Sequence, residues 1–143
     1  LSMASVTEQI LARIQTVLSG AAIVPSGHVA RGREERFGDD EIPALNIRRM
    51  GTLLDAETFE TDRQRLSLTI QILVAGPAGE TAADALHTSV HAALMADSVL
   101  QQIGHDSLRH VGTDTEADVI EQPFFQLNCH YEIDAWVSRG ELT

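Results

Sequence analysis

Two long stretches of strict alternation between apolar and polar residues constrain the fold most. In LSLTIQILV, apolar side chains occupy every second position from Leu66 to Val74, and FFQLNCHYEIDAWV repeats the pattern from Phe125 to Val137. Because successive side chains of a strand point to opposite faces, each stretch predicts a strand with one buried and one polar face. Cys129 lies on the apolar face, where a buried and unreactive thiol is expected.

Two amphipathic helices are predicted to cover the apolar face of this sheet. From Ser5 to Leu18, apolar residues recur at helical spacing behind a capping pattern made by Ser5 and Glu8. An alanine-rich stretch from Thr81 to Ala96 has the same periodicity, and Asp97 could cap one further turn.

Weaker patterns complete two hairpins. We predict one strand from Pro43 onward and another over Ser107–Gly112, the latter followed by an acidic turn at 112–118. Residues 51–65 are too short and polar for a crossover helix and are expected to form a protruding hairpin arm, while residues 19–42 are expected to be a loop. The order α-β-β-α-β-β predicts an α+β fold, in which two antiparallel hairpins form one sheet and two main helices pack on one face.

Length and charge limit the partners of the chain. Its 143 residues suit a single domain over 1–143, and Leu1 and Ser2 are expected to be residues added by cloning before the native start at Met3. All 10 basic residues are Arg, against 21 acidic residues, and the net charge is −11. Residues 66–143 hold 2 Arg and 11 acids, a balance of −9. This half is expected to bind neither nucleic acid nor an anionic membrane, and without an apolar span or signal peptide a cytosolic protein is expected.

The sequence offers few groups for catalysis or metal binding. His87 and His91 are four residues apart on the second helix, but HTSVH lacks the glutamate of the HExxH motif, so both are expected to be helix-surface residues. His110 and His130 could meet across the last hairpin, where ordinary polar-face side chains are the expectation. The acidic run 39–41 fits no cation loop, and neither a GxSxG elbow nor a glycine-rich phosphate loop is present. No catalytic, cofactor-binding or metal-binding residue is therefore predicted.

Two groups of side chains are candidates for contact with a neighbouring subunit or tube. Arginines near acids can form ion pairs between molecules, and apolar side chains on an arm can be buried in a neighbour. The candidates are Arg31, Arg33, Arg36, Arg48 and Arg49, together with Leu53, Leu54 and Phe59. A solvated mixed-charge surface, and packing of the arm on its own chain, stay open as alternatives.

Taken as a whole, the pattern resembles the tail terminator and tail completion proteins of long-tailed phages, the group of the lambda minor tail protein U. The resemblance spans nearly the full chain and lies in the order of its segments. These are the N-terminal amphipathic helix, IPALNIRRMG, the arm, LSLTIQILVAG, the helix that ends in MADSVL, and FFQLNCHYEIDAW.

This resemblance implies a structural phage or prophage protein without catalytic residues. Such a protein forms a ring, usually a hexamer, on the end of the tail tube, terminates tube polymerisation and provides the head–tail joining surface. The implied partners are further copies of the chain, the tail tube protein and the head–tail connector protein. DNA passes through the lumen without specific binding, no membrane is involved, and the location is the virion tail after assembly in the host cytoplasm. Two alternatives stay open: a small metal-dependent enzyme that uses His87, His91 and another ligand, or a host interaction module of the same layout.

Overall fold

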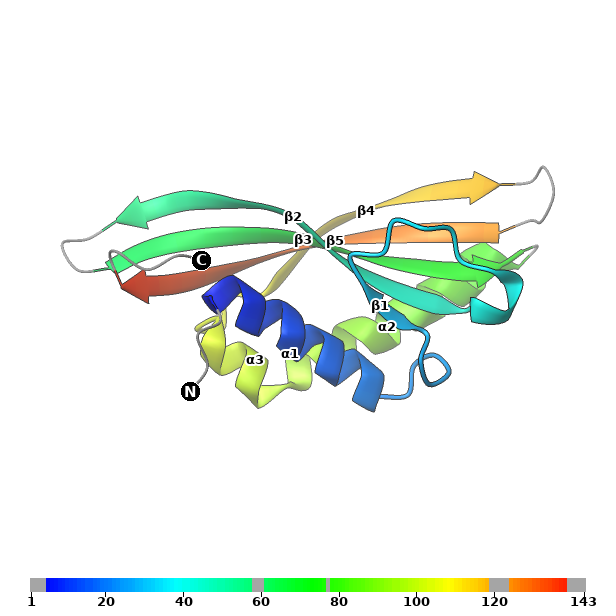
Figure 1. Ribbon diagram of the computed structural model, residues 1–143, viewed down its shortest axis with the longest axis horizontal. Helices are drawn as coiled ribbons and strands as arrows, with labels where there is room; N and C mark the ends of the chain where they lie inside the picture. Colours follow the sequence, from blue (N-terminus) through cyan, green and yellow to red (C-terminus); the bar gives the residue numbers. More distant parts are fainter. Residues whose placement is uncertain (1–4, 58–60, 77, 119–123, 139–143) are drawn as a thin grey trace.

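The fold is an α+β arrangement of one five-stranded mixed sheet with three helices on one face (Figure 1). The computed structural model describes residues 5–57, 61–76, 78–118 and 124–138. In chain order the elements are α1 (Val6–Gly20), β1 (Val29–Arg31), a 3₁₀-helix (Asp39–Glu41), β2 (Ala44–Glu57), β3 (Thr61–Ala75), α2 (Gly79–Ala96), α3 (Ser98–Ile103), β4 (Arg109–Asp118) and β5 (Phe124–Ser138). The strands lie in the order β1-β2-β3-β5-β4.

The predicted α+β class is confirmed, but the two-hairpin layout is incomplete. Residues 19–42 were expected to form a loop, and they contain β1, which pairs in parallel with β2 through Val29 and Leu45. Two backbone hydrogen bonds extend this pairing, from Leu45 N to the His28 carbonyl at 2.9 Å and from Gly32 N to the Ile47 carbonyl at 2.8 Å. Three residues are too few to show a periodic pattern, so the strand could not be predicted from the sequence.

The hairpin arm is regular strand over most of its length. The β2–β3 hairpin is antiparallel as predicted, and the arm expected over residues 51–65 is mostly strand, because β2 continues to Glu57 and β3 begins at Thr61. Register shifts at Arg49/Gly51 and Leu54/Ala56 interrupt the two-residue period and conceal the strands. β3 also pairs here with β5, and the three strands extend beyond the helices (Figure 1).

The acidic stretch 112–118 is a strand rather than a turn. It forms most of β4 and pairs with β5 from Gly112 opposite His130 to Asp118 opposite Phe124. Because β4 is the last strand of the sheet in the described residues, most of its side chains are exposed and need not be apolar. Because β4 is polar, its sequence shows no alternation of apolar and polar residues from which a strand could be predicted.

α1 and α3 start at the predicted capping residues, whereas α2 starts at Gly79, before the predicted Thr81 and without a side-chain cap. Ser5 accepts a hydrogen bond from the Glu8 backbone N–H at 3.1 Å, and Asp97 caps α3 through the Leu100 N–H at 2.8 Å, as predicted. The helices cover the apolar side of β3 and β5, and one core forms between the layers. Its largest buried members include Tyr131, Ile10, Ile14, Leu18, Leu45, Leu66, Leu68, Ile70, Ile72, Leu94 and Leu100.

A loop from β1 crosses the polar face of the sheet (Figure 1). Asn46 on β2 holds this loop, since it accepts from the Arg33 N–H at 3.1 Å and donates to the Arg33 carbonyl at 2.9 Å. The Arg36 guanidinium reaches the Phe124 ring on β5, 5.6 Å from its centroid. No helix in the described part of the chain has the length and apolar composition to cross a membrane.

Candidate functional site

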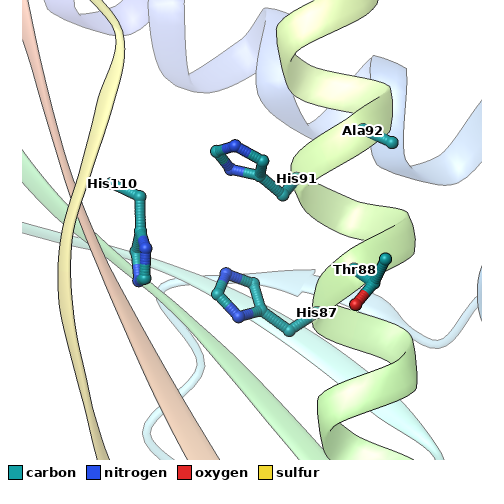
Figure 2. Close-up of a pocket in the computed structure, with 5 residues that line it drawn as sticks. All are labelled: His87, Thr88, His91, Ala92 and His110. Carbon is teal, nitrogen blue, oxygen red and sulfur yellow. The ribbon is translucent and has the colours of Figure 1, made fainter.

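Three histidines and a tyrosine meet between α2 and the sheet. His87 and His91 lie one turn apart on α2 and face His110 on β4 across a shared space (Figure 2). Tyr131 on β5 is fully buried and stands directly opposite His110 in the strand register. The period of the helix and the register of the last hairpin thus bring four side chains from three elements together.

The two helix histidines bind the same phenol oxygen. Tyr131 Oη lies 3.0 Å from His87 Nε2 and 2.9 Å from His91 Nδ1. The ring centroid of His110 is 4.8 Å from that of His87 and 6.1 Å from that of His91. A cavity of about 340 Å³ opens beside the rings and is lined by His87, Thr88, His91, Ala92 and His110 (Figure 2).

Burial keeps His87 and Tyr131 uncharged. Partial burial, together with the imidazoles of His110 and His91, lowers the pKa of His87, so its ring is neutral at pH 7. Burial also raises the pKa of Tyr131, which stays protonated. With one proton, the phenol donates to one of the two imidazole nitrogens and accepts from the other.

His110 has a defined proton position. Its Nε2 lies 3.0 Å from the carbonyl oxygen of Gly112, which can only accept a hydrogen bond. Nε2 must therefore carry the proton. In the neutral ring, the lone pair is then on Nδ1.

The expectation for His87 and His91 is wrong, because they are half-buried over Tyr131 rather than free on the helix surface. His130 is on the polar face of the sheet, as expected, whereas His110 pairs with Tyr131 on the helix-covered side. The two histidines therefore lie on opposite faces and do not meet.

Tyr131 and His110 are the members of this cluster that the sequence argument missed. Tyr131 occupies an apolar-face position of the closing strand, and a buried phenol normally needs a hydrogen-bond partner. From that requirement, polar side chains could have been predicted on the helix that covers Tyr131, where His87 and His91 lie. The participation of His110 depends on a pairing register that the sequence does not display.

A second polar chain lies on the other face of the sheet. His130 Nδ1 is 2.8 Å from Thr69 Oγ1, and His130 Nε2 is 2.6 Å from Asp114 Oδ2. Hydrogen bonds from Asn128 and His130 hold the pKa of Asp114 below its usual range. The order hydroxyl, imidazole, carboxylate is that of a hydrolase triad, but Thr69 is 3% exposed and out of reach of a substrate. The hydrogen bonds among these side chains link β3, β5 and β4.

Cys129 is buried on the helix-covered face, as expected. Burial raises the pKa of its thiol to about 12, so it is protonated and unreactive at pH 7.

Three of the candidate interface arginines bind within their own chain. Arg31 pairs with Glu8, and Arg33 Nη2 donates to Glu41 Oε1 at 2.9 Å. The Arg33 hydrogen bond, with help from the Gly38 N–H, lowers the pKa of Glu41 to about 2. Together with Arg36 over the Phe124 ring, these contacts fix the crossing loop.

The remaining candidates lie on β2 and the arm. Arg48 is half-buried on the polar face, and Arg49 is exposed with its Nη2 2.8 Å from Thr52 Oγ1. Leu53 is 60% exposed, and Met50, three residues earlier on β2, is 61% exposed. The side chain of Leu54, and the whole of Phe59, lie outside the described residues.

Among the side chains that the structure describes, no group of three or more His, Cys, Asp or Glu residues could hold a metal ion. In the acidic run 39–41, Glu41 is engaged by Arg33 and by the Gly38 N–H at 2.9 Å.

No known protein-family model matches the chain, and no curated protein sequence shows significant similarity to it.

Proposed function

We propose that this chain is a structural phage or prophage protein that closes a ring of six copies on the end of a tail tube. The ring stops tube polymerisation and presents a surface to the head–tail connector protein, and DNA passes through its lumen without specific binding. The proposal rests on the sequence resemblance and on one structural observation: the sheet has two open edges, one of which begins with two arginines while the other is acidic.

The first open edge belongs to β2. Among the described strands, β1 covers β2 only at Leu45–Ile47, so the rest of β2 pairs on one side alone. Arg48 and Arg49 begin this uncovered stretch, and the exposed apolar side chains of Met50 and Leu53 follow. The first part of this edge is therefore basic and partly apolar, and the acidic residues Asp55 and Glu57 follow near its end.

The second open edge is β4, which pairs only with β5 in the described part of the sheet. Asp114 and Glu116 are exposed on it, and Val111 is 52% exposed at the register shift next to Gly112. This edge is acidic and carries an apolar side chain as well. Unpaired strand edges are normally protected or used for pairing, and neither edge has a cover among the described residues.

Strand direction allows the two edges to join. Because β2–β3, β3–β5 and β5–β4 are all antiparallel, β4 runs opposite to β2. A second copy placed head-to-tail therefore brings its β4 antiparallel to β2 and continues the sheet. Arg48, which is on the same polar face of the sheet as Asp114 and Glu116, then approaches these acids, and this favours the head-to-tail orientation. When each copy binds the next through the same head-to-tail contact, and the rotation between neighbouring copies adds up to a full turn, the copies form a closed ring.

The charge of the whole chain fits a passage for DNA. A net charge of −11 repels phosphates, so a lumen lined by this protein lets the duplex pass without holding it.

Light scattering and electron microscopy of the purified protein, alone and with tail tubes, test this function. We expect rings of six copies and capped tubes. Arg48→Glu with Arg49→Glu, or Glu116→Arg alone, should abolish ring formation while the circular dichroism spectrum stays unchanged. Gln102→Arg, which adds charge on the exposed side of α3, is the control and should assemble normally. A chain that stays monomeric at all concentrations and on tail tubes contradicts the proposal.

A further inference from the structure

We propose that His87, His91 and His110 form an acid-sensitive contact, which holds the middle of α2 against β4 and β5 while the imidazoles are neutral and releases it when they take up protons from water. His87 and His91 belong to α2 and face His110 of β4 (Figure 2). All three rings lie around the ring of Tyr131 on β5, with centroid separations of 5.2 to 6.2 Å. The contact lies within one chain, so it does not depend on the proposed ring.

The three imidazoles are close enough for their charges to interact. The ring centroids are 4.8 Å apart for His87–His110, 6.1 Å for His91–His110 and 6.2 Å for His87–His91. These separations are shorter than the Debye length of about 10 Å at 0.1 M salt, and the half-buried positions of His87 and His91 reduce screening further. Neutral rings pack at these distances without electrostatic cost, whereas two imidazolium ions repel each other.

Protonation also disturbs the hydrogen bonds of the buried phenol. Tyr131 Oη lies 3.0 Å from His87 Nε2 and 2.9 Å from His91 Nδ1, and its one proton is donated to one of these nitrogens. When that imidazole is protonated, its nitrogen becomes an N–H donor and can no longer accept a hydrogen bond. The phenol proton then faces a second proton inside the core, where Tyr131 is fully buried. Because an unsatisfied buried hydroxyl is destabilising, acid weakens the contact at this oxygen as well.

The elements packed against α2 give an imidazolium ion little compensation. On β5, burial raises the pKa of Tyr131 and of Cys129, so both side chains are protonated and carry no negative charge. β3 contributes apolar core side chains such as Ile70. Arg13 of α1 is bound to Asp97 at the C-terminal end of α2, beyond the histidines.

The charges nearest to His87 act in opposite directions. Burial and the imidazoles of His110 and His91 lower the pKa of His87 from its ordinary value of 6.5, while the carboxylate of Asp84, one turn earlier on α2, raises it. Asp114 of β4 lies on the opposite face of the sheet. Since the folded-state pKa of His87 is lowered, its contribution to stability is complete above about pH 7 and is lost as the pH falls below 6.5 toward the folded-state value.

Water reaches the cluster without unfolding of the core. His110 is exposed, and a cavity of about 340 Å³ opens beside the three rings. Protons therefore enter from the solvent on this side. Outward movement of α2 gives the charged rings the hydration that they lack in the closed structure.

Native-state hydrogen exchange at about pH 7.5 and about pH 5 tests the contact. After correction for intrinsic exchange rates, we expect the protection of the α2 amides of Val90 and Leu94 to fall at least about tenfold at the lower pH. The protection of Ile10 and Ile14 on α1 should change by less than about threefold, because α1 carries no member of the cluster.

Histidine variants separate this contact from a general effect of acid. His87→Gln combined with His110→Gln removes two imidazoles and leaves a side-chain amide that can bond the Tyr131 hydroxyl. In this variant, the protection of α2 should be the same at both pH values to within about threefold. His105→Asn removes an exposed histidine outside the cluster, at a positive φ that Asn tolerates, and should lose protection as the wild type does.

Two results overturn the proposal: protection of α2 in the wild type that is equal at both pH values, or a loss that the double glutamine variant shows in full. If that variant lacks a native circular dichroism spectrum, His110→Gln alone replaces it, because His110 is exposed and both hydrogen bonds of Tyr131 then stay in place. The loss of protection should be at least about threefold smaller in this single variant than in the wild type, and an undiminished loss overturns the proposal equally.

Discussion

At the scale of single residues, the hydroxyl of Tyr131 is a polar group on the largest fully buried side chain of the core. The side chain is fully buried, and its oxygen is bonded by His87 and His91. A buried hydroxyl that loses its partners carries a desolvation penalty of about 1–3 kcal/mol, whereas removing the donor and its acceptors together is nearly neutral.

This asymmetry predicts a double-mutant result. The variant with His87→Ala and His91→Ala should lose about 1–3 kcal/mol of unfolding free energy, because both substitutions remove a hydrogen-bond partner of the Tyr131 hydroxyl. Adding Tyr131→Phe to that variant should restore part of the loss. Urea denaturation of the four proteins measures the cycle, and a purely additive result contradicts it.

Asp97 has two roles that differ in their dependence on pH. It caps α3, and both of its oxygens accept from Arg13, at 2.6 and 2.9 Å. The Arg13 hydrogen bond holds the pKa of Asp97 below its ordinary value of 3.8. Since the folded-state pKa is lowered, the stabilisation is complete above about pH 4–5 and is lost as the pH falls through the folded-state value.

Asp97→Asn keeps a capping side chain and removes the ion pair. We expect a cost of about 1 kcal/mol at pH 7, which shrinks as the pH falls from about 5 through the folded-state pKa of Asp97. Urea denaturation of both proteins across this range measures the difference. A cost that stays constant with pH would mean that the charge of Asp97 does not contribute.

At the scale of elements, α2 lies against β5 at its first residue. A Cβ added at Gly79 would stand 2.5 Å from Phe125 Cβ, while a Cβ at Gly20 would meet no atom within 4 Å. Both glycines are at helix ends, so a comparison of their alanine variants distinguishes the cost of close packing from the gain in helix propensity.

Gly79→Ala should therefore destabilise the protein by about 1–3 kcal/mol, because the helix must move away from β5. Gly20→Ala should be neutral or stabilise it by up to about 1 kcal/mol. Thermal unfolding compares the two variants with the wild type, and an equal effect of both would contradict the close contact.

The elements that periodicity predicts are those with one buried face over many residues. Leu66–Val74, Phe125–Val137 and both main helices were predicted on that basis and are present. β1 and the acidic part of β4 were missed, because edge strands gain little from apolar side chains and short strands show no period. At the histidine cluster, helix spacing predicted that His87 and His91 lie together. The contributions of Tyr131 and His110 come from contacts between distant segments, which no local pattern contains.

At the scale of the whole molecule, the proposed ring joins a basic edge to an acidic edge. Contacts of this kind weaken with salt, since the Debye length falls from about 10 Å at 0.1 M to about 3 Å at 1 M. We expect the proportion of rings in free protein to fall as sodium chloride is raised over this range. Analytical ultracentrifugation measures the change, and rings that become more stable in salt would indicate a contact dominated by Met50, Leu53 and Val111.

The same charge difference restricts which symmetry a pair of chains can adopt. A two-fold dimer formed edge to edge through β4 would set Asp114 and Glu116 of one copy against the same acids of the other. Repulsion between these like charges opposes that pairing. The acidic β4 edge is therefore expected to pair with the β2 edge of another copy rather than with a second β4, and growth by this sheet is directional.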